Sequence, residues 1–102
     1  MFVAETTIRT KLGSRYLQQL CKHFAHKITV QFDKTDGRAD FGFGTCVMAA
    51  GEDSLALRCE AGTRDALGRV HFIVDDHVRR FTWREKPAIE WSLPAGADQP
   101  AP

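Results

Sequence analysis

Apolar and polar positions first alternate and then follow a helical spacing at the start of the chain. Over residues 2–10 every second side chain is apolar or neutral, which is typical of a β-strand with one buried face. Gly13 ends this pattern, and Ser14 is a suitable N-cap for a helix that runs to about His26. The apolar stripe of this amphipathic helix would consist of Tyr16, Leu17, Leu20, Cys21 and Phe24.

A β-hairpin is predicted next. Residues 28–33 alternate with the same two-residue period as the first strand. Asp36-Gly37 is a pair that favours a two-residue hairpin turn, because both positions of that turn need a positive φ. The turn would set the register of the two strands and place Phe32 opposite Phe41.

The strand after this turn is predicted over residues 39–49, and it can return to its neighbour in two ways. A three-residue loop at 51–53 needs no irregularity, whereas a two-residue turn at 51–52 requires a bulge near Gly44. We favour the three-residue loop. The fourth strand would then bury one face, formed by Leu55, Leu57, Cys59 and Ala61.

A second helix and a last strand complete the pattern. Thr63 is a suitable N-cap for a helix that ends at about Phe81, and Pro87 precedes a strand over residues 88–93. The apolar stripe of the helix would consist of Ala66, Leu67, Val70, Val74, His77, Val78 and Phe81.

The order of elements is β-α-β-β-β-α-β, which one domain can satisfy as a two-layer α+β sandwich. We expect a mostly antiparallel, five-stranded sheet with both helices on one face. Residues 1–93 would form this single domain, because about 100 residues are enough for one core only. Residues 94–102 are rich in proline and alanine and are expected to be a disordered tail.

Composition excludes several classes of partner. The chain is 43% hydrophobic and 26% charged, with a formal net charge of +1, so it has no field that would attract nucleic acid or an anionic membrane. No apolar run reaches the ~20 residues that span a bilayer. The three cysteines cannot all pair and form no C-x-x-C motif, which favours reduced thiols and a cytoplasmic location.

Two groups of side chains are candidates for metal binding. His23 and His26, in the stretch CKHFAHK, lie on neighbouring positions of the first helix, but two ligands fall short of the three or four that a zinc site needs. The second group is predicted on inward faces and comprises Cys21, Cys59 and His77, with His71 as a fourth member. Buried cysteine and histidine are common in cores, so we expect no metal and no cofactor.

An interaction surface is predicted on the open face of the sheet. The favoured register leaves small or apolar side chains there, where an antiparallel sheet normally carries polar ones. Phe72 adds to this prediction, since it lies opposite the apolar stripe of the second helix. The sheet residues of the predicted interface are Gly42, Gly44, Cys46, Met48 and Ala56.

Catalytic motifs are weak or missing in the sequence. It contains no G-x-S-x-G elbow, and GFGTCV lacks the third glycine of a dinucleotide fingerprint. The neighbouring carboxylates Asp75 and Asp76 each have an arginine four residues on, which favours ordinary ion pairs over acid–base chemistry. We therefore expect a protein that is not an enzyme.

Four stretches carry a resemblance to a known family. SRYLQQLCKHFAHK, FGFGTC, DDHVRRFTWRE and a closing IEW resemble the small bacterial family called domain of unknown function 2218, over about residues 5–93. The resemblance implies no activity, because the family has none assigned. Domains of this family occur beside or fused to siderophore-interacting flavin reductases, so the resemblance also implies a link to iron handling and a reductase-type partner.

Two functions follow as hypotheses. The first is a non-enzymatic accessory or protein-interaction domain, which self-associates or binds a partner through the open sheet face. The second is a metal- or cofactor-binding protein that uses His23 and His26, or Cys21, Cys59 and His77.

Overall fold

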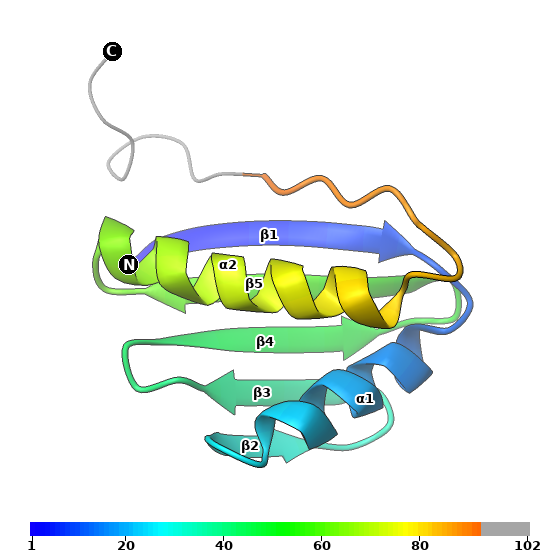
Figure 1. The fold of residues 1–102 in the computed structure, drawn as a ribbon, viewed down its shortest axis with the longest axis horizontal. Coiled ribbons are helices and arrows are strands. Elements are labelled where there is room, and N and C mark those ends of the chain that lie inside the picture. The colour runs from blue at the N-terminus through cyan, green and yellow to red at the C-terminus, as the bar shows by residue number, and fades with distance from the viewer. Residues whose placement is uncertain (93–102) are drawn as a thin grey trace.

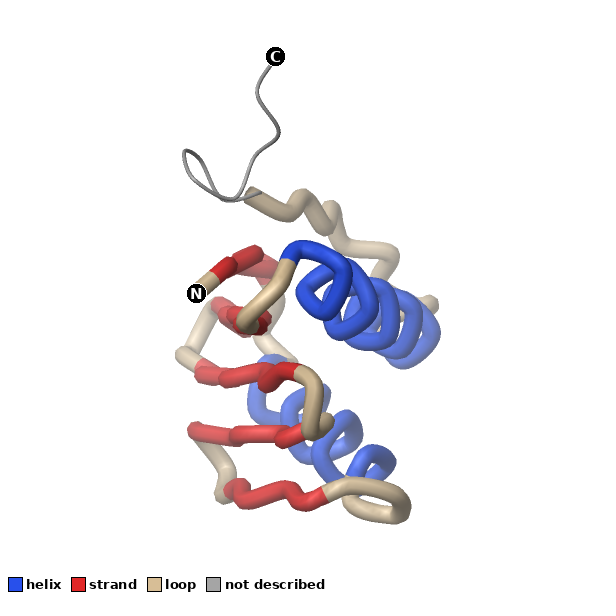
Figure 2. The backbone as a smooth tube through the Cα atoms, turned by 90° about the vertical axis from the view of Figure 1, so that its left-hand side faces the viewer, coloured by secondary structure: helices blue, strands red, loops and turns tan. Residues whose placement is uncertain are grey.

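In the computed structural model of the protein, which describes residues 1–92, five strands form one antiparallel sheet in the order β1-β5-β4-β3-β2 (Figure 1). Two helices cover one face of this sheet, and the other face is open (Figure 2). The predicted α+β two-layer architecture is confirmed, while the predicted tail at 94–102 lies outside the described residues. The elements are β1 (Phe2–Arg9), α1 (Gly13–Phe24), β2 (Thr29–Phe32), β3 (Asp36–Asp40), β4 (Gly44–Ala50), β5 (Ser54–Ala61) and α2 (Arg64–Phe81).

The core lies between the sheet and the helices and contains the apolar stripes that the helical spacing predicts. All five stripe residues of α1 are buried, and so are Leu67, Val70, Val74 and Val78 of α2. Thr63 caps α2 as predicted, since its hydroxyl accepts a hydrogen bond from the Ala66 N–H at 3.1 Å. Ser14 is not the N-cap of α1, because its hydroxyl donates to the carbonyl of Lys34 at 2.6 Å.

The β2–β3 turn does not use Asp36-Gly37. Its backbone is held by the carboxylate of Asp33, which accepts from the N–H groups of Thr35 at 2.9 Å and Asp36 at 2.8 Å. Phe32 therefore pairs with Gly37, and the predicted pairing with Phe41 is wrong. Gly37 lies inside β3, where a Cβ atom would come within 2.8 Å of the Cys21 sulfur. Glycine is needed there for the close approach of α1 to the sheet.

The strand predicted over 39–49 is two strands, β3 and β4, joined by a tight turn. The Phe41 N–H donates to the Gly44 carbonyl at 2.8 Å, and Gly42 between them has a φ of +86°. This reversal changes which side chains of β4 face the helices. Cys46 and Met48 are fully buried, so their predicted placement on the open face is wrong.

Gly44 also lies on the buried side of β4, because a Cβ atom there would come within 2.6 Å of the Val70 side chain. The β4–β5 connection is a two-residue turn closed by a hydrogen bond from the Gly51 N–H to the Ser54 carbonyl at 2.9 Å. Cys46 pairs with Cys59, so neither predicted register of these strands is correct. The predicted burial of β5 is confirmed for Leu55, Leu57, Cys59 and Ala61.

The open face of the sheet is mainly polar. Charged side chains of the strands are exposed on it, and the Arg58 guanidinium forms an ion pair with Glu60 at 2.7 Å. Polar residues on one side are the usual arrangement for an antiparallel sheet with one solvated face. The exposed strand residues include Glu5, Thr7, Arg9, Asp36, Arg38, Asp40 and Arg58.

Residues 87–92 run beside β1 without forming the strand predicted at 88–93 (Figure 1). One antiparallel bridge joins Ser92 to Glu5, with backbone hydrogen bonds of 2.7 and 3.2 Å. The segment is otherwise held by side chains, since the Glu90 carbonyl accepts from the Thr6 hydroxyl at 2.7 Å. No helix within the described residues is long and apolar enough to cross a membrane.

Candidate functional sites

The structure separates the members of the predicted Cys21, Cys59 and His77 group. Cys21 is buried, with its sulfur 3.7 Å from that of Met48, and burial raises the pKa of its thiol to about 11. Cys59 lies opposite Cys46, whose pKa is raised well above the usual range by a hydrogen bond between the two thiols and by burial. Within residues 1–92 no three His, Cys, Asp or Glu side chains are placed to hold one metal ion.

Two predicted ligands from different groups come together instead. The rings of His23 on α1 and His77 on α2 have their centroids 4.8 Å apart. His26 lies beyond the end of α1 and is exposed. The structure therefore places an imidazole of each helix side by side, a pairing that neither sequence hypothesis contained.

These two imidazoles border a cleft of about 480 Å³, which we call the imidazole cleft. It opens where the end of α1, the middle of α2 and the β3–β4 turn meet. Aromatic rings form most of its wall: Phe24 packs edge-on against Phe41 at 5.3 Å and against His77 at 5.2 Å. Its lining residues are His23, Phe24, His26, Lys27, Ile28, Phe41, Phe43, Ile73 and His77.

Hydrogen bonding defines the tautomer of His77. Its Nδ1 atom lies 2.7 Å from the carbonyl oxygen of Ile73, and a carbonyl can only accept, so Nδ1 carries the proton. In the neutral ring Nε2 is then a hydrogen-bond acceptor. His23 is exposed overall, but partial desolvation lowers the pKa of its imidazole, and the nearby His77, His26, Lys27 and Arg80 lower it further.

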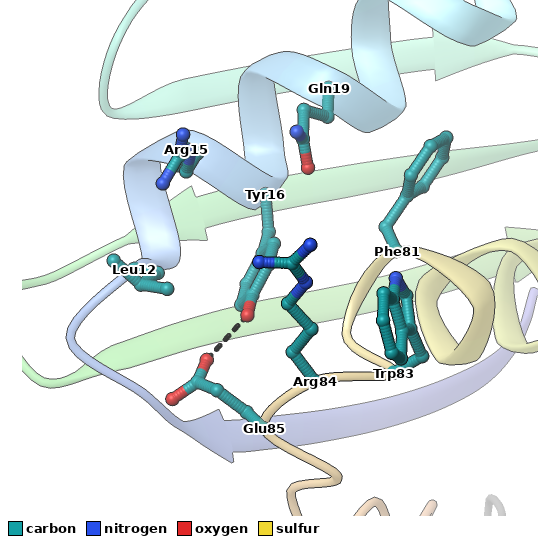
Figure 3. A pocket seen from close by; sticks show the side chains of 8 residues that line it. All are labelled: Leu12, Arg15, Tyr16, Gln19, Phe81, Trp83, Arg84 and Glu85. Atoms are coloured by element: carbon teal, nitrogen blue, oxygen red, sulfur yellow. Dashed lines mark hydrogen bonds between the residues drawn. The ribbon is translucent and has the colours of Figure 1, made fainter.

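A second cavity, of about 360 Å³, lies between the start of α1 and the residues that follow α2; we call it the tryptophan pocket (Figure 3). The Tyr16 hydroxyl donates to the Glu85 carboxylate at 2.6 Å, and the Thr10 hydroxyl donates to the same oxygen at 2.7 Å. These bonds join the residue that follows β1, helix α1 and the segment after α2. The lining residues are Leu12, Arg15, Tyr16, Gln19, Phe81, Trp83, Arg84 and Glu85.

The rim of the tryptophan pocket exposes large side chains. Trp83 is 60% exposed and Leu12 is 37% exposed. The Arg84 guanidinium lies 5.0 Å from the centroid of the Trp83 ring, and Arg84 and Tyr16 line the same pocket (Figure 3). Neither Arg84 nor Arg15 takes part in the ion pairs that the described residues form. The pocket thus combines an accessible indole with two guanidinium groups.

Tyr16 provides a test of this geometry. Burial raises the pKa of its phenol to about 12, and the hydrogen bond to Glu85 and the charge of Glu85 contribute. Because the native state favours the protonated phenol, its contribution to stability is complete below about pH 10 and is lost as the pH rises through 12. Tyr16 is the single tyrosine, so absorbance of the phenolate reports it alone. We expect native protein to titrate near pH 12.

Glu85→Gln is the matched variant for this titration. It removes the carboxylate charge and leaves the burial of Tyr16 in place, so the pKa should fall and still exceed the ordinary value of about 10. A native wild-type titration centred near that ordinary value would show that the phenol is solvated and the geometry incorrect.

The predicted interface residues have divided outcomes. Phe72 is 71% exposed on α2, and Gly42 is exposed in the β3–β4 turn, whereas Gly44, Cys46 and Met48 belong to the buried side of the sheet. Sequence reasoning missed Trp83 and Arg84 as surface residues. The sequence feature that could have indicated them is the stretch TWRE, which directly follows the second helix. A tryptophan there lies outside the apolar stripe of that helix.

The fold defines a small two-layer α+β domain, with one antiparallel sheet and two helices on one of its faces. A family described as an uncharacterized protein conserved in bacteria, domain of unknown function 2218, matches residues 5–92, and the chain belongs to this family. The NMR structure of PA4090 from Pseudomonas aeruginosa is similar, with a TM-score of 0.76 and 32% identity over 90% of this chain and 96% of that one. The curated proteins contain no match.

Proposed function

We propose that the protein is a non-enzymatic accessory domain, which binds an acidic, aromatic-containing segment of a partner protein in the tryptophan pocket. One observation carries the proposal: Trp83 is 60% exposed at the rim of a cavity that also holds Arg15 and Arg84. Tryptophan, tyrosine and arginine are the residues most often found at the centre of interfaces. The two guanidinium groups favour carboxylates on the partner.

The partner is a different protein in this proposal. Self-association was predicted from an apolar strip on the open sheet face, and the main members of that strip, Cys46 and Met48, are in the core. The family resemblance supports a reductase-type partner in siderophore metabolism. Three cysteines without a disulfide support a cytoplasmic location.

A random copolymer of glutamate and tyrosine is a suitable probe, because it supplies carboxylates and aromatic rings without a defined sequence. The two tryptophans, Trp83 and Trp91, each give one indole N–H resonance. The indole N–H of Trp91 donates a hydrogen bond to the Asp75 carboxylate at 2.9 Å. On titration into ¹⁵N-labelled protein, the copolymer should shift the Trp83 indole resonance and leave that of Trp91 in place. Trp83→Ala should weaken binding by about 10-fold or more, as for central interface residues.

Matched variants distinguish the pocket from general charge attraction. Arg84→Gln should weaken binding, whereas Arg38→Gln removes the same charge from the open sheet face and should leave it nearly unchanged. Phe72→Ala removes another exposed ring and should also have little effect. Equal losses for Arg84→Gln and Arg38→Gln would mean that the copolymer binds by net charge alone, and the proposal would fail.

A further inference from the structure

We propose that the imidazole cleft is a second binding site, which takes a small, uncharged aromatic molecule with a hydroxyl group, of the phenol class. The site is distinct from the proposed partner interface, because its lining shares no residue with the tryptophan pocket; the two adjoin where the rings of His23 and Phe81 lie 5.8 Å apart. Three features of the cleft define the ligand: its aromatic walls, the acceptor on His77 and the charges around it.

The walls of the cleft suit a flat aromatic molecule. Its volume of about 480 Å³ falls within the range of about 300–1,000 Å³ that is usual for small-molecule sites. Phe41 and Phe43 are only partly buried, with ring centroids 6.1 Å apart, so each leaves ring surface facing the cleft or solvent. An aromatic ligand that stacks on such rings, or packs edge-on against them, gains binding free energy beyond that of the buried area alone.

The acceptor of the site is Nε2 of His77. The hydrogen bond from Nδ1 to the Ile73 carbonyl, at 2.7 Å, fixes the proton on Nδ1 and leaves the lone pair on Nε2. An aromatic hydrocarbon has no hydrogen-bond donor for this lone pair, and covering the lone pair without a donor is costly. A ligand hydroxyl would satisfy it.

The charges around the cleft exclude a cationic ligand. Lys27 is the one permanently charged residue of the lining among the described residues, and no carboxylate belongs to it. The Arg69 guanidinium lies over the Phe43 ring at 4.2 Å, which adds a second cation nearby. These groups repel ammonium ions and divalent metals and favour a hydroxyl whose oxygen carries partial negative charge, as in a phenol. His23 and His77 alone would also leave a metal with two protein ligands.

Three ligands of one shape test this inference: 2-naphthol, naphthalene and 2-naphthoate, titrated into ¹⁵N-labelled protein. We expect 2-naphthol to shift the amide resonances of Phe41 and Ile73 and to bind about 2- to 10-fold more tightly than naphthalene, the gain expected from one hydrogen bond. His77→Phe keeps a ring and removes the acceptor, so it should abolish this preference. Phe72→Ala, which removes an exposed ring outside the lining of the cleft, should preserve it.

Each other outcome overturns the proposal in a defined way. Equal binding of 2-naphthol and naphthalene would show that His77 accepts no hydrogen bond, and tightest binding of 2-naphthoate would assign the site to an anion held by Lys27. Stoichiometric binding of Zn²⁺ that His77→Phe abolishes would identify a metal site instead. If His77→Phe does not fold, His77→Leu serves the same comparison. Trp83→Ala should retain 2-naphthol binding, which separates this site from the partner interface.

Discussion

Replacing Leu20 by alanine is expected to lower the free energy of unfolding by about 2–5 kcal/mol. Leu20 lies on the apolar stripe of α1 and is fully buried against the sheet. The substitution removes one methine and two methyl carbons from a packed core and leaves a cavity that the neighbours fill only in part. Chemical denaturation of both proteins, followed by circular dichroism, measures the difference.

His26→Ala is the matched control on the same segment of chain. His26 follows the end of α1 and is exposed, so its loss should change stability by no more than about 0.5 kcal/mol. Comparable losses for the two variants would mean that α1 does not bury the stripe described above.

Gly44→Ala is expected to destabilise the protein by about 1–3 kcal/mol, although it adds a single methyl group. The new Cβ atom would lie 2.6 Å from the Val70 side chain and 2.7 Å from the carbonyl oxygen of Glu60. The Glu60 carbonyl belongs to the backbone of β5, so the clash can be relieved only if a strand or α2 moves. Thermal or chemical unfolding of the variant provides the measurement.

Gly68→Ala adds the same methyl group at a position where nothing lies within 4 Å. Gly68 is inside α2, where alanine is better than glycine by about 0.5–1 kcal/mol, so this variant should be more stable than the wild type. Opposite signs for the two substitutions are therefore expected. A neutral Gly44→Ala variant would show that α2 packs less closely on β4 than the structure has it.

Periodicity predicted the helices well because the helical stripe is set by each segment alone. The stripe of α1 needs no knowledge of the sheet, and its five members are all buried as predicted. The register of the strands depends on where turns lie, and glycine marks turns ambiguously. Gly37 was assigned to a turn and is needed for close packing, while Gly42 was assigned to a strand and has the positive φ of a turn.

One misplaced turn accounts for most of the error in the candidate sites. Because side chains alternate along a strand, the reversal at Phe41–Phe43 moved Cys46 and Met48 from the predicted surface to the core. The contact of His23 with His77 was unpredictable for another reason: it depends on how two helices lie beside each other on the sheet. Each residue was recognised from the sequence, but their proximity was not.

The position of β1 at one edge of the sheet has a consequence for synthesis on the ribosome. Among the five strands of the described residues β1 is synthesised first, yet its neighbour in the sheet is β5, which is synthesised last of the five. At about 5–20 residues per second, the N-terminal strand waits several seconds without its partner. The exposed charged side chains of Glu5 and Arg9 lower the risk that β1 pairs with another nascent chain during that time, because charged side chains disfavour contact between strand edges.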